Sequence, residues 1–284
     1  MKRRPPRLGE TLARLSTHYG REFLPTDPIQ FPHRYGAAGD QEVVAFVAAA
    51  LAYGSVPQIA QSVERALAAL GAVHSSPAAA IDAWRIGEHR GLVEGFRHRF
   101  NDGRDLACLF SFLSQMRRRA GSIAGFFAEG RRPDDTLRES LASFSRRALA
   151  LDAGALYGRE LPRDAGVRFF FTSPLDGSAC KRLCMFLRWV VRPNDGVDLG
   201  LWTCLAPREL VMPLDTHTTR ICFANGLSPS PFATWRNAEH VTAALRRYDP
   251  ADPVRFDFAL SRLGILRVSD RRCGLRVRVP TRRR

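Results

Sequence analysis

Lysine is almost missing from this sequence. Of its 43 lysine and arginine residues, only Lys2 and Lys181 are lysines, and the remaining 41 are arginines. Arginine supplies positive charge and bidentate contacts, but it cannot lose its proton and act as an amine nucleophile. The single internal lysine is therefore open to two interpretations: an ordinary surface residue, or a residue retained for amine chemistry.

The six cysteines do not form the pattern of a metal site. The sequence has no Cys-x-x-Cys pair and no series of cysteines at metal-ligand spacing, which argues against the common zinc motifs and a four-cysteine iron–sulfur loop. Cys180 and Cys184 stand one helical turn apart. This spacing is compatible with a redox or metal pair, although small packing residues are the favoured interpretation. We expect free thiols, no metal, no iron–sulfur cluster and no other cofactor.

Long apolar runs are missing as well. The longest nearly apolar stretch, Val43–Tyr53, is shorter than the roughly 20 residues that span a bilayer as a helix. The basic N-terminal segment has no continuous hydrophobic core of the kind that directs export. We therefore predict a soluble, cytoplasmic protein with no membrane partner. We also expect it to be a monomer.

Acidic residues are scarce relative to basic ones. The chain has 28 of them, which leaves a formal net charge of +15 and a pI near 10.7. This balance predicts a polyanionic partner, nucleic acid first and an anionic membrane surface second. A GC-rich genome accounts for arginine in place of lysine, but it does not account for the surplus of positive charge.

Apolar residues recur at helical spacing along most of the chain, without the sustained alternation of a β-strand. We predict an all-α, two-lobed fold. Residues 1–9 are expected to form a basic, disordered lead-in, residues 10–266 a single helical domain with a cleft between its lobes, and residues 267–284 a basic tail that acts as an electrostatic arm.

Several residues predict where the helices begin. Asp40 is expected to cap a helix over Gln41–Tyr53, and the Asp252-Pro253 pair is expected to cap the last helix of the domain. Asp215 is expected to cap a helix that runs to Asn225. For Asp215 taken alone, this structural role is the favoured interpretation.

The helix that carries Lys181 is predicted to start near Asp176 and to end before Pro193. Lys181 lies roughly opposite the apolar stripe of this helix, on the same side as Arg188 and Arg192. A helix N-terminus and nearby arginines both disfavour a cation, so they favour the neutral amine that a nucleophile requires. The stripe itself comprises Leu183, Phe186, Leu187, Val190 and Val191.

Aromatic and basic residues alternate over Gly95–Phe100. This interleaving suits contacts to a nucleic-acid backbone, for which Arg97 and Arg99 are the candidates. Solvated arginines along a helix edge account for the pattern equally well.

Two motifs resemble the helix-hairpin-helix (HhH-GPD) superfamily of DNA glycosylases. Residues 213–220, Pro-Leu-Asp-Thr-His-Thr-Thr-Arg, followed by Gly226-Leu227, resemble the Val-Asp-Thr-His-Val-x-Arg…Leu-Gly stretch of its endonuclease III-like members. Residues 177–181, Gly-Ser-Ala-Cys-Lys, align with the Gly-Val-Gly-x-Lys of the superfamily hairpin, with Ala179 in place of its second glycine. The longer connection between the motifs is similar to that of the archaeal 8-oxoguanine branch, and the whole pattern resembles an uncharacterised bacterial branch of the superfamily.

The resemblance implies roles for individual residues. Lys181 falls on the catalytic lysine and Asp215 on the catalytic aspartate, while Tyr53-Gly54-Ser55 falls near the loop that wedges into the base stack. Residues around these positions are implied to contact DNA. They are Gly177, Ser178, Ala179, Arg182, Thr216, His217 and Arg220; a packed or solvated helix position is the slightly favoured interpretation of His217.

The function implied is base-excision repair of damaged duplex DNA by a glycosylase, with or without AP lyase activity. Lys181 would act as the nucleophile and Asp215 as the carboxylate that stabilises the charge on the sugar. An oxidised purine such as 8-oxoguanine is the substrate that we predict. The alternative is a non-catalytic nucleic-acid-binding protein that retains the glycosylase fold.

Overall fold

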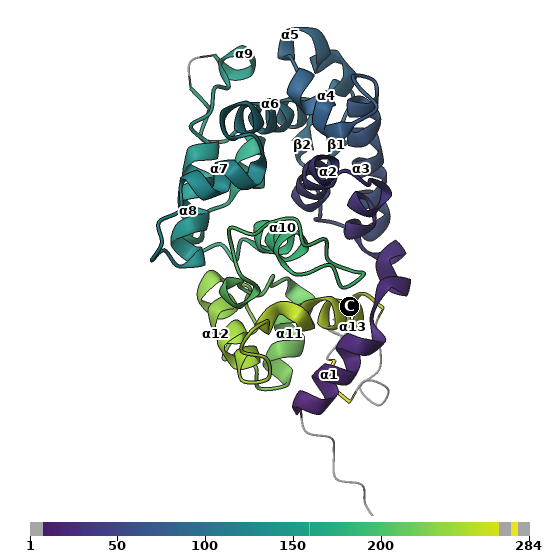
Figure 1. Cartoon of the computed structure of the whole chain (residues 1–284), viewed down its shortest axis with the longest axis vertical. Coiled ribbons are helices and arrows are strands. Elements are labelled where there is room, and N and C mark those ends of the chain that lie inside the picture. The colour runs from purple at the N-terminus through teal and green to yellow at the C-terminus, as the bar shows by residue number, and fades with distance from the viewer. Residues whose placement is uncertain (1–7, 159, 267–273, 278–284) are drawn as a thin grey trace, which may run out of the picture.

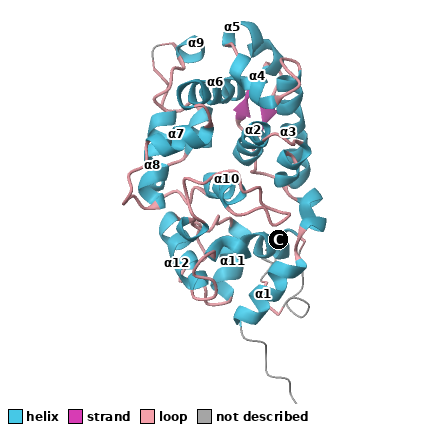
Figure 2. Cartoon of the chain, viewed as in Figure 1, coloured by secondary structure: helices cyan, strands magenta, loops and turns pink. Residues whose placement is uncertain are grey.

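The computed structural model describes residues 8–158, 160–266 and 274–277 (Figure 1). This part of the chain is mostly helical, which confirms the predicted all-α class (Figure 2). The predicted lead-in falls mainly on residues 1–7, which lie outside the described residues, and the first helix begins at Leu8. None of the helices in the described ranges has the length and apolar content that a membrane crossing requires.

The helices fall into two groups with α10 between them (Figure 1). The upper group in this view contains α2 to α9, and the lower group contains α1 with α11 to α13. The bounds of the helices are α1 (Leu8–His18), α2 (Ala38–Ala50), α3 (Val56–Gly71), α4 (Pro77–Ala83), α5 (Ile86–His89), α6 (Gly103–Ala120), α7 (Ile123–Glu129), α8 (Leu137–Ala148), α9 (Gly154–Tyr157), α10 (Lys181–Val191), α11 (Thr216–Ala224), α12 (Trp235–Arg246) and α13 (Asp257–Ile265).

Two helices form the centre of the core. Every residue of α2 from Glu42 to Ala50 is buried, and all of them except Glu42 are apolar. Helix α10 packs against α2 and is buried from Arg182 onward. The predicted apolar stripe of α10 lies in the core. Arg188 and Arg192, which were expected on the opposite side of the helix, are also buried.

Arg188 and Arg192 are buried because carboxylates surround them. Arg188 pairs with Asp198 at 3.0 Å and with Asp257 at 2.6 Å, while Arg192 pairs with Asp198 and, at 2.9 Å, with Asp252. A buried charge is tolerated only when it is paired and hydrogen-bonded. This ion network joins α10 to the connection after it and to the lower group of helices. Both arginines are thus engaged with carboxylates in the interior.

The start of α10 differs from the prediction. The helix begins at Lys181 rather than near Asp176, because Gly177 (φ 76°) and Cys180 (φ 47°) both adopt left-handed backbone conformations that a continuous helix does not contain. A short 3₁₀ turn, Pro174–Asp176, precedes them. Lys181 is consequently the first residue of α10.

Two predicted caps serve other elements. The N-cap of α2 is Ala37, and the Asp40 carboxylate instead accepts hydrogen bonds from the Ser76 hydroxyl (2.5 Å) and the Ala78 backbone N–H (2.8 Å) at the start of α4. Asp252 pairs with Arg192 and accepts no capping hydrogen bond with its side chain. Both aspartates lie at helix starts, as expected, but their carboxylates interact with residues that are distant in the chain.

A short β-hairpin lies where a helix edge was considered. Strands β1 (Arg97–His98) and β2 (Asn101–Asp102) pair antiparallel, with His98 opposite Asn101. Asp102 then caps α6 in a capping box with Asp105. Two-residue strands are too short for the alternation of side chains to be visible in the sequence.

The predicted basic tail lies outside the described residues except for 274–277. Within that segment Leu275 and Val277 are buried in the core, which corrects the expectation of a purely electrostatic arm. The backbone of Arg276 exchanges two hydrogen bonds with the Asn225 side chain at the end of α11, each 3.0 Å long. The chain therefore returns to the lower group of helices at this point.

Candidate functional site

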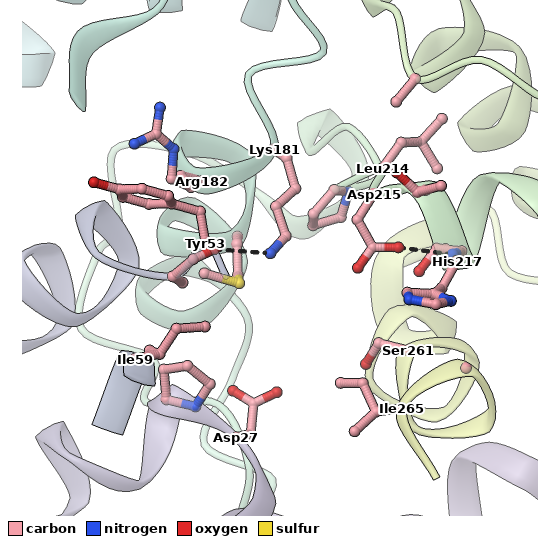
Figure 3. Close-up of a pocket in the computed structure, with 18 of the residues that line it drawn as sticks. Asp27, Tyr53, Ile59, Lys181, Arg182, Leu214, Asp215, His217, Ser261 and Ile265 are labelled. Atoms are coloured by element: carbon pink, nitrogen blue, oxygen red, sulfur yellow. Dashed lines mark hydrogen bonds between the residues drawn. The ribbon is translucent and has the colours of Figure 1, made fainter. Parts of the chain in front are cut away.

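A cavity of about 1060 Å³ lies between the two groups of helices. Its walls are formed by the turn between α2 and α3, the loop before α10, the start of α11 and the last turns of α13. Lys181 and Asp215 both line it and extend into it from different elements (Figure 3). The two residues, 34 positions apart in the chain, therefore share one site.

Lys181 is placed at the cavity by the two left-handed residues that precede α10. Its amine donates a hydrogen bond to the Ala52 backbone oxygen at 3.2 Å (Figure 3). That carbonyl lies two residues beyond the end of α2 (Ala38–Ala50). The amine is thus held at the cavity wall by a neutral acceptor, and its nitrogen is directed into the cavity.

The backbone of the loop before α10 does not require glycine at position 179. The left-handed positions are Gly177 and Cys180, and the backbone at Ala179 has a negative φ. Ala179 therefore carries no conformational cost from its side chain, which is buried. Ser178 accepts a hydrogen bond from the Cys180 N–H at 3.2 Å and forms an isolated β-bridge with Thr234. Ser178 and Ala179 line the cavity, while Gly177 lies outside its lining.

Asp215 acts as the N-cap of α11, as predicted. One carboxylate oxygen accepts a hydrogen bond from the Thr218 N–H at 2.7 Å, and the other oxygen faces the cavity (Figure 3). Pro213 and Leu214, directly before it, are buried and fix the entry to the helix. The capping role and a role in the cavity are therefore compatible, because each uses a different oxygen.

Of the three other residues of α11 that were predicted to contact DNA, two line the cavity. Thr216 and His217 are exposed and line the cavity, whereas Arg220 lies outside its lining. His217 also contacts α13, where a Cβ added to Gly264 would lie 2.7 Å from the His217 Cβ. Glycine at this position allows α11 and α13 to approach closely beside the cavity.

The Arg182 side chain is buried and forms hydrogen bonds with the protein interior. Its guanidinium donates to the backbone oxygens of Ala50 and Phe169 and lies over the Phe169 ring, 3.5 Å from the centroid. Burial lowers the pKa of Arg182 to about 10. These contacts argue against the predicted direct phosphate contact, because the charged group is already occupied. Arg182 instead holds the carbonyl end of α2 beside Lys181.

Tyr53-Gly54-Ser55 forms the turn between α2 and α3, and all three residues line the cavity. The Tyr53 hydroxyl donates to the His98 backbone oxygen at 3.0 Å. Gly54 has a φ of 107°, which favours glycine. Arg97 and Arg99 are exposed on the neighbouring hairpin and lie outside the cavity lining.

Sequence reasoning missed four charged residues of the cavity wall: Asp27, Arg188, Asp257 and Arg262. Arg262 pairs with Asp27 at 2.6 Å and Arg188 with Asp257 at 2.6 Å. Burial raises the pKa of Asp257 to about 6, and the negative charge of Asp215 contributes in the same direction. Helical spacing placed Arg188 on the Lys181 side of its helix, but nothing in the local pattern signals the other three residues, because their partners are distant in the chain.

The described part of the chain is thus a mostly helical protein with a candidate amine–carboxylate site, in which Lys181 and Asp215 open into one cavity. The chain belongs to the family described as Protein of unknown function (DUF2400), whose model matches residues 27–266. The match includes every residue that lines the cavity except Thr26, so both Lys181 and Asp215 lie within it. No curated protein matches this chain, and no solved structure does.

Clustered metal ligands do not occur in the described ranges. No group of three or more histidine, cysteine, aspartate or glutamate side chains is placed to hold a metal ion there. The five described cysteines are free thiols, and burial raises the pKa of the Cys180 thiol to about 11.

Proposed function

We propose that this protein is a DNA glycosylase with the helix-hairpin-helix glycosylase fold, in which Lys181 is the nucleophile. The observation that carries the proposal is that the single internal lysine and the Asp215 carboxylate project into one cavity (Figure 3). A volume of about 1060 Å³ is sufficient for a base and its sugar. The net charge of +15 supports a nucleic-acid partner.

The chemistry starts when a damaged nucleotide leaves the duplex and enters the cavity. Unstacking costs a few kcal/mol and is least for a lesion, which favours damaged bases. The neutral Lys181 amine then attacks C1′ of the sugar, and the glycosidic bond breaks with its electrons on the departing base, which takes up a proton. Loss of the amine proton and opening of the sugar ring leave an imine between Lys181 and C1′.

Asp215 supplies negative charge where positive charge develops. As the glycosidic bond breaks, the sugar acquires oxocarbenium character, and a carboxylate oxygen that faces the cavity stabilises it. From the imine, loss of a C2′ proton and departure of the 3′ phosphate break the strand. This second step is the AP lyase activity, and an oxidised purine such as 8-oxoguanine is our first choice of substrate.

The test is reductive trapping of the imine. The protein is incubated with duplexes that carry an abasic site, 8-oxoguanine, uracil or thymine glycol, and borohydride is added. The expected result is a covalent protein–DNA adduct with at least one of these duplexes. Absence of an adduct with every lesion, while DNA binding persists, would overturn the proposal in favour of nucleic-acid binding without chemistry.

Asp215→Asn separates the two roles of Asp215. Asparagine is as good an N-cap as aspartate, so the thermal midpoint should stay close to that of the wild type. Loss of the charge should slow adduct formation by about 10²–10³-fold, measured in single-turnover trapping. Asp215→Ala is the companion variant, and loss of the cap should lower its stability by about 1 kcal/mol. Wild-type trapping rates in Asp215→Asn would limit Asp215 to the structural role.

A further inference from the structure

The β1–β2 hairpin presents an exposed aromatic ring beside the cavity. Phe100 is 56% exposed, and its ring stacks on Tyr53 with the centroids 5.4 Å apart and 29° between the planes. The Phe169 ring makes a T-shaped contact with it, with the ring centroids 4.6 Å apart and 78° between the planes. Tyr53 and Phe169 both line the cavity. Phe100 therefore continues the cavity wall outward as a supported aromatic surface.

The backbone at the tip of this hairpin is strained. Arg99 and Phe100 form a two-residue loop between the paired residues His98 and Asn101, and Arg99 has a φ of 57°. Such loops favour glycine or asparagine where φ is positive, because other side chains are crowded there. Arginine at this position is consistent with a side chain retained for function. Gly54 leaves room for it, since a Cβ there would lie 3.3 Å from Arg99 Cδ.

Polar contacts hold the base of the hairpin in place. The His98 ring forms hydrogen bonds with the Ser62 hydroxyl (2.8 Å) and the Tyr53 backbone oxygen (3.0 Å). On the other strand, the Asn101 amide donates to Asp105 at 2.9 Å. Arg99 and Phe100 form the tip between these two anchored residues, so the aromatic ring is presented by a hydrogen-bonded support. Preorganisation of this kind reduces the entropy cost of binding.

We infer that Arg99 and Phe100 form a nucleobase-stacking platform for a nucleotide that flanks the one in the cavity. This inference rests on the proposed function. Aromatic rings bind bases through their faces irrespective of sequence, and the exposed charges of Arg97 and Arg99 suit the phosphates on either side of such a base. The ligand class is thus a polynucleotide strand whose stacking is interrupted, rather than a free nucleotide.

Binding to a duplex that contains an abasic-site analogue, with 2-aminopurine as the flanking base, tests this platform. Phe100→Ala should weaken affinity about 5- to 150-fold, the range for loss of one aromatic–base stack, and should reduce the change in 2-aminopurine fluorescence on binding. Phe100→Trp should retain both. The matched control is Phe223→Ala, which removes a 46% exposed phenylalanine of α11 that does not line the cavity.

Arg99→Gly provides an independent measurement that does not depend on loss of fold. Glycine relieves the positive φ, so the thermal midpoint should rise or remain unchanged. Affinity should nevertheless fall, and the slope of log affinity against log salt should decrease by about one. A fall in both midpoint and affinity would reduce Arg99 to a structural residue.

The outcomes separate the platform from the proposed chemistry. Wild-type affinity and fluorescence in Phe100→Ala, together with a trapped adduct, would overturn the platform and leave the glycosylase proposal standing. An effect of Phe100→Ala without an adduct in the wild type would support the platform and overturn the chemistry. Absence of binding to any duplex would overturn both.

Discussion

Lys181→Arg and Lys181→Gln are expected to abolish the borohydride-trapped adduct. Arginine preserves the positive charge but cannot form an imine, and glutamine removes the charge. Loss of a covalent nucleophile lowers turnover by roughly 10⁴-fold or more. The single hydrogen bond of Lys181 to Ala52 is a small part of the packing of α10, so the fold should persist. Single-turnover trapping on denaturing gels, with thermal unfolding measured alongside, checks both expectations.

The chain offers a matched control for this experiment. Lys2 is the only other lysine, so Lys2→Arg should leave the adduct unchanged. The N-terminal amine is the one remaining primary amine in the wild-type chain. Peptide mapping of the reduced adduct therefore has two informative results: a modified Lys181 supports the mechanism, and a modified N-terminus in Lys181→Arg refutes it.

Asp198→Asn is expected to give the largest loss of stability. Asp198 is fully buried and pairs with both Arg188 and Arg192. Removal of its charge leaves two buried guanidinium groups with fewer carboxylates, and breaking a buried pair in this way costs about 3–5 kcal/mol. Because Arg188 lines the cavity, binding should weaken as well. Urea-induced unfolding gives the free energy of unfolding and the m-value.

Asp195→Asn tests whether burial causes that effect. Asp195 also pairs with Arg192, at 3.1 Å, but its side chain is 44% exposed. An exposed pair contributes about 0–1 kcal/mol, and asparagine can still accept the backbone hydrogen bond that Asp195 accepts from Val197. The free energy of unfolding should thus change by less than about 1 kcal/mol. Equal losses in Asp195→Asn and Asp198→Asn would contradict the assigned role of the buried network.

The sequence predicted features of the helices correctly where they depend on residues that are close together in the chain. The apolar stripe of α10 is buried as expected, and Asp215 caps α11. The start of α10 could not be predicted, because the left-handed Cys180 has no signature in its side chain. Asp40 was misassigned because Ser76 and Ala78, which engage its carboxylate, lie far along the chain.

By itself, the sequence determined the helical class, the basic charge and the two residues proposed to carry the chemistry. The helical class and the charge follow from periodicity and composition, and Lys181 stands out as the one internal lysine. Asp215 was singled out by the resemblance of residues 213–220 to a glycosylase motif, because the sequence around it alone indicates only a helix cap. Only the tertiary structure decided that Lys181 and Asp215 open into one cavity, that Arg182 is engaged in the interior, and that Phe100 lies beside the cavity. The physical reason is that burial and pairing depend on which distant segments pack together.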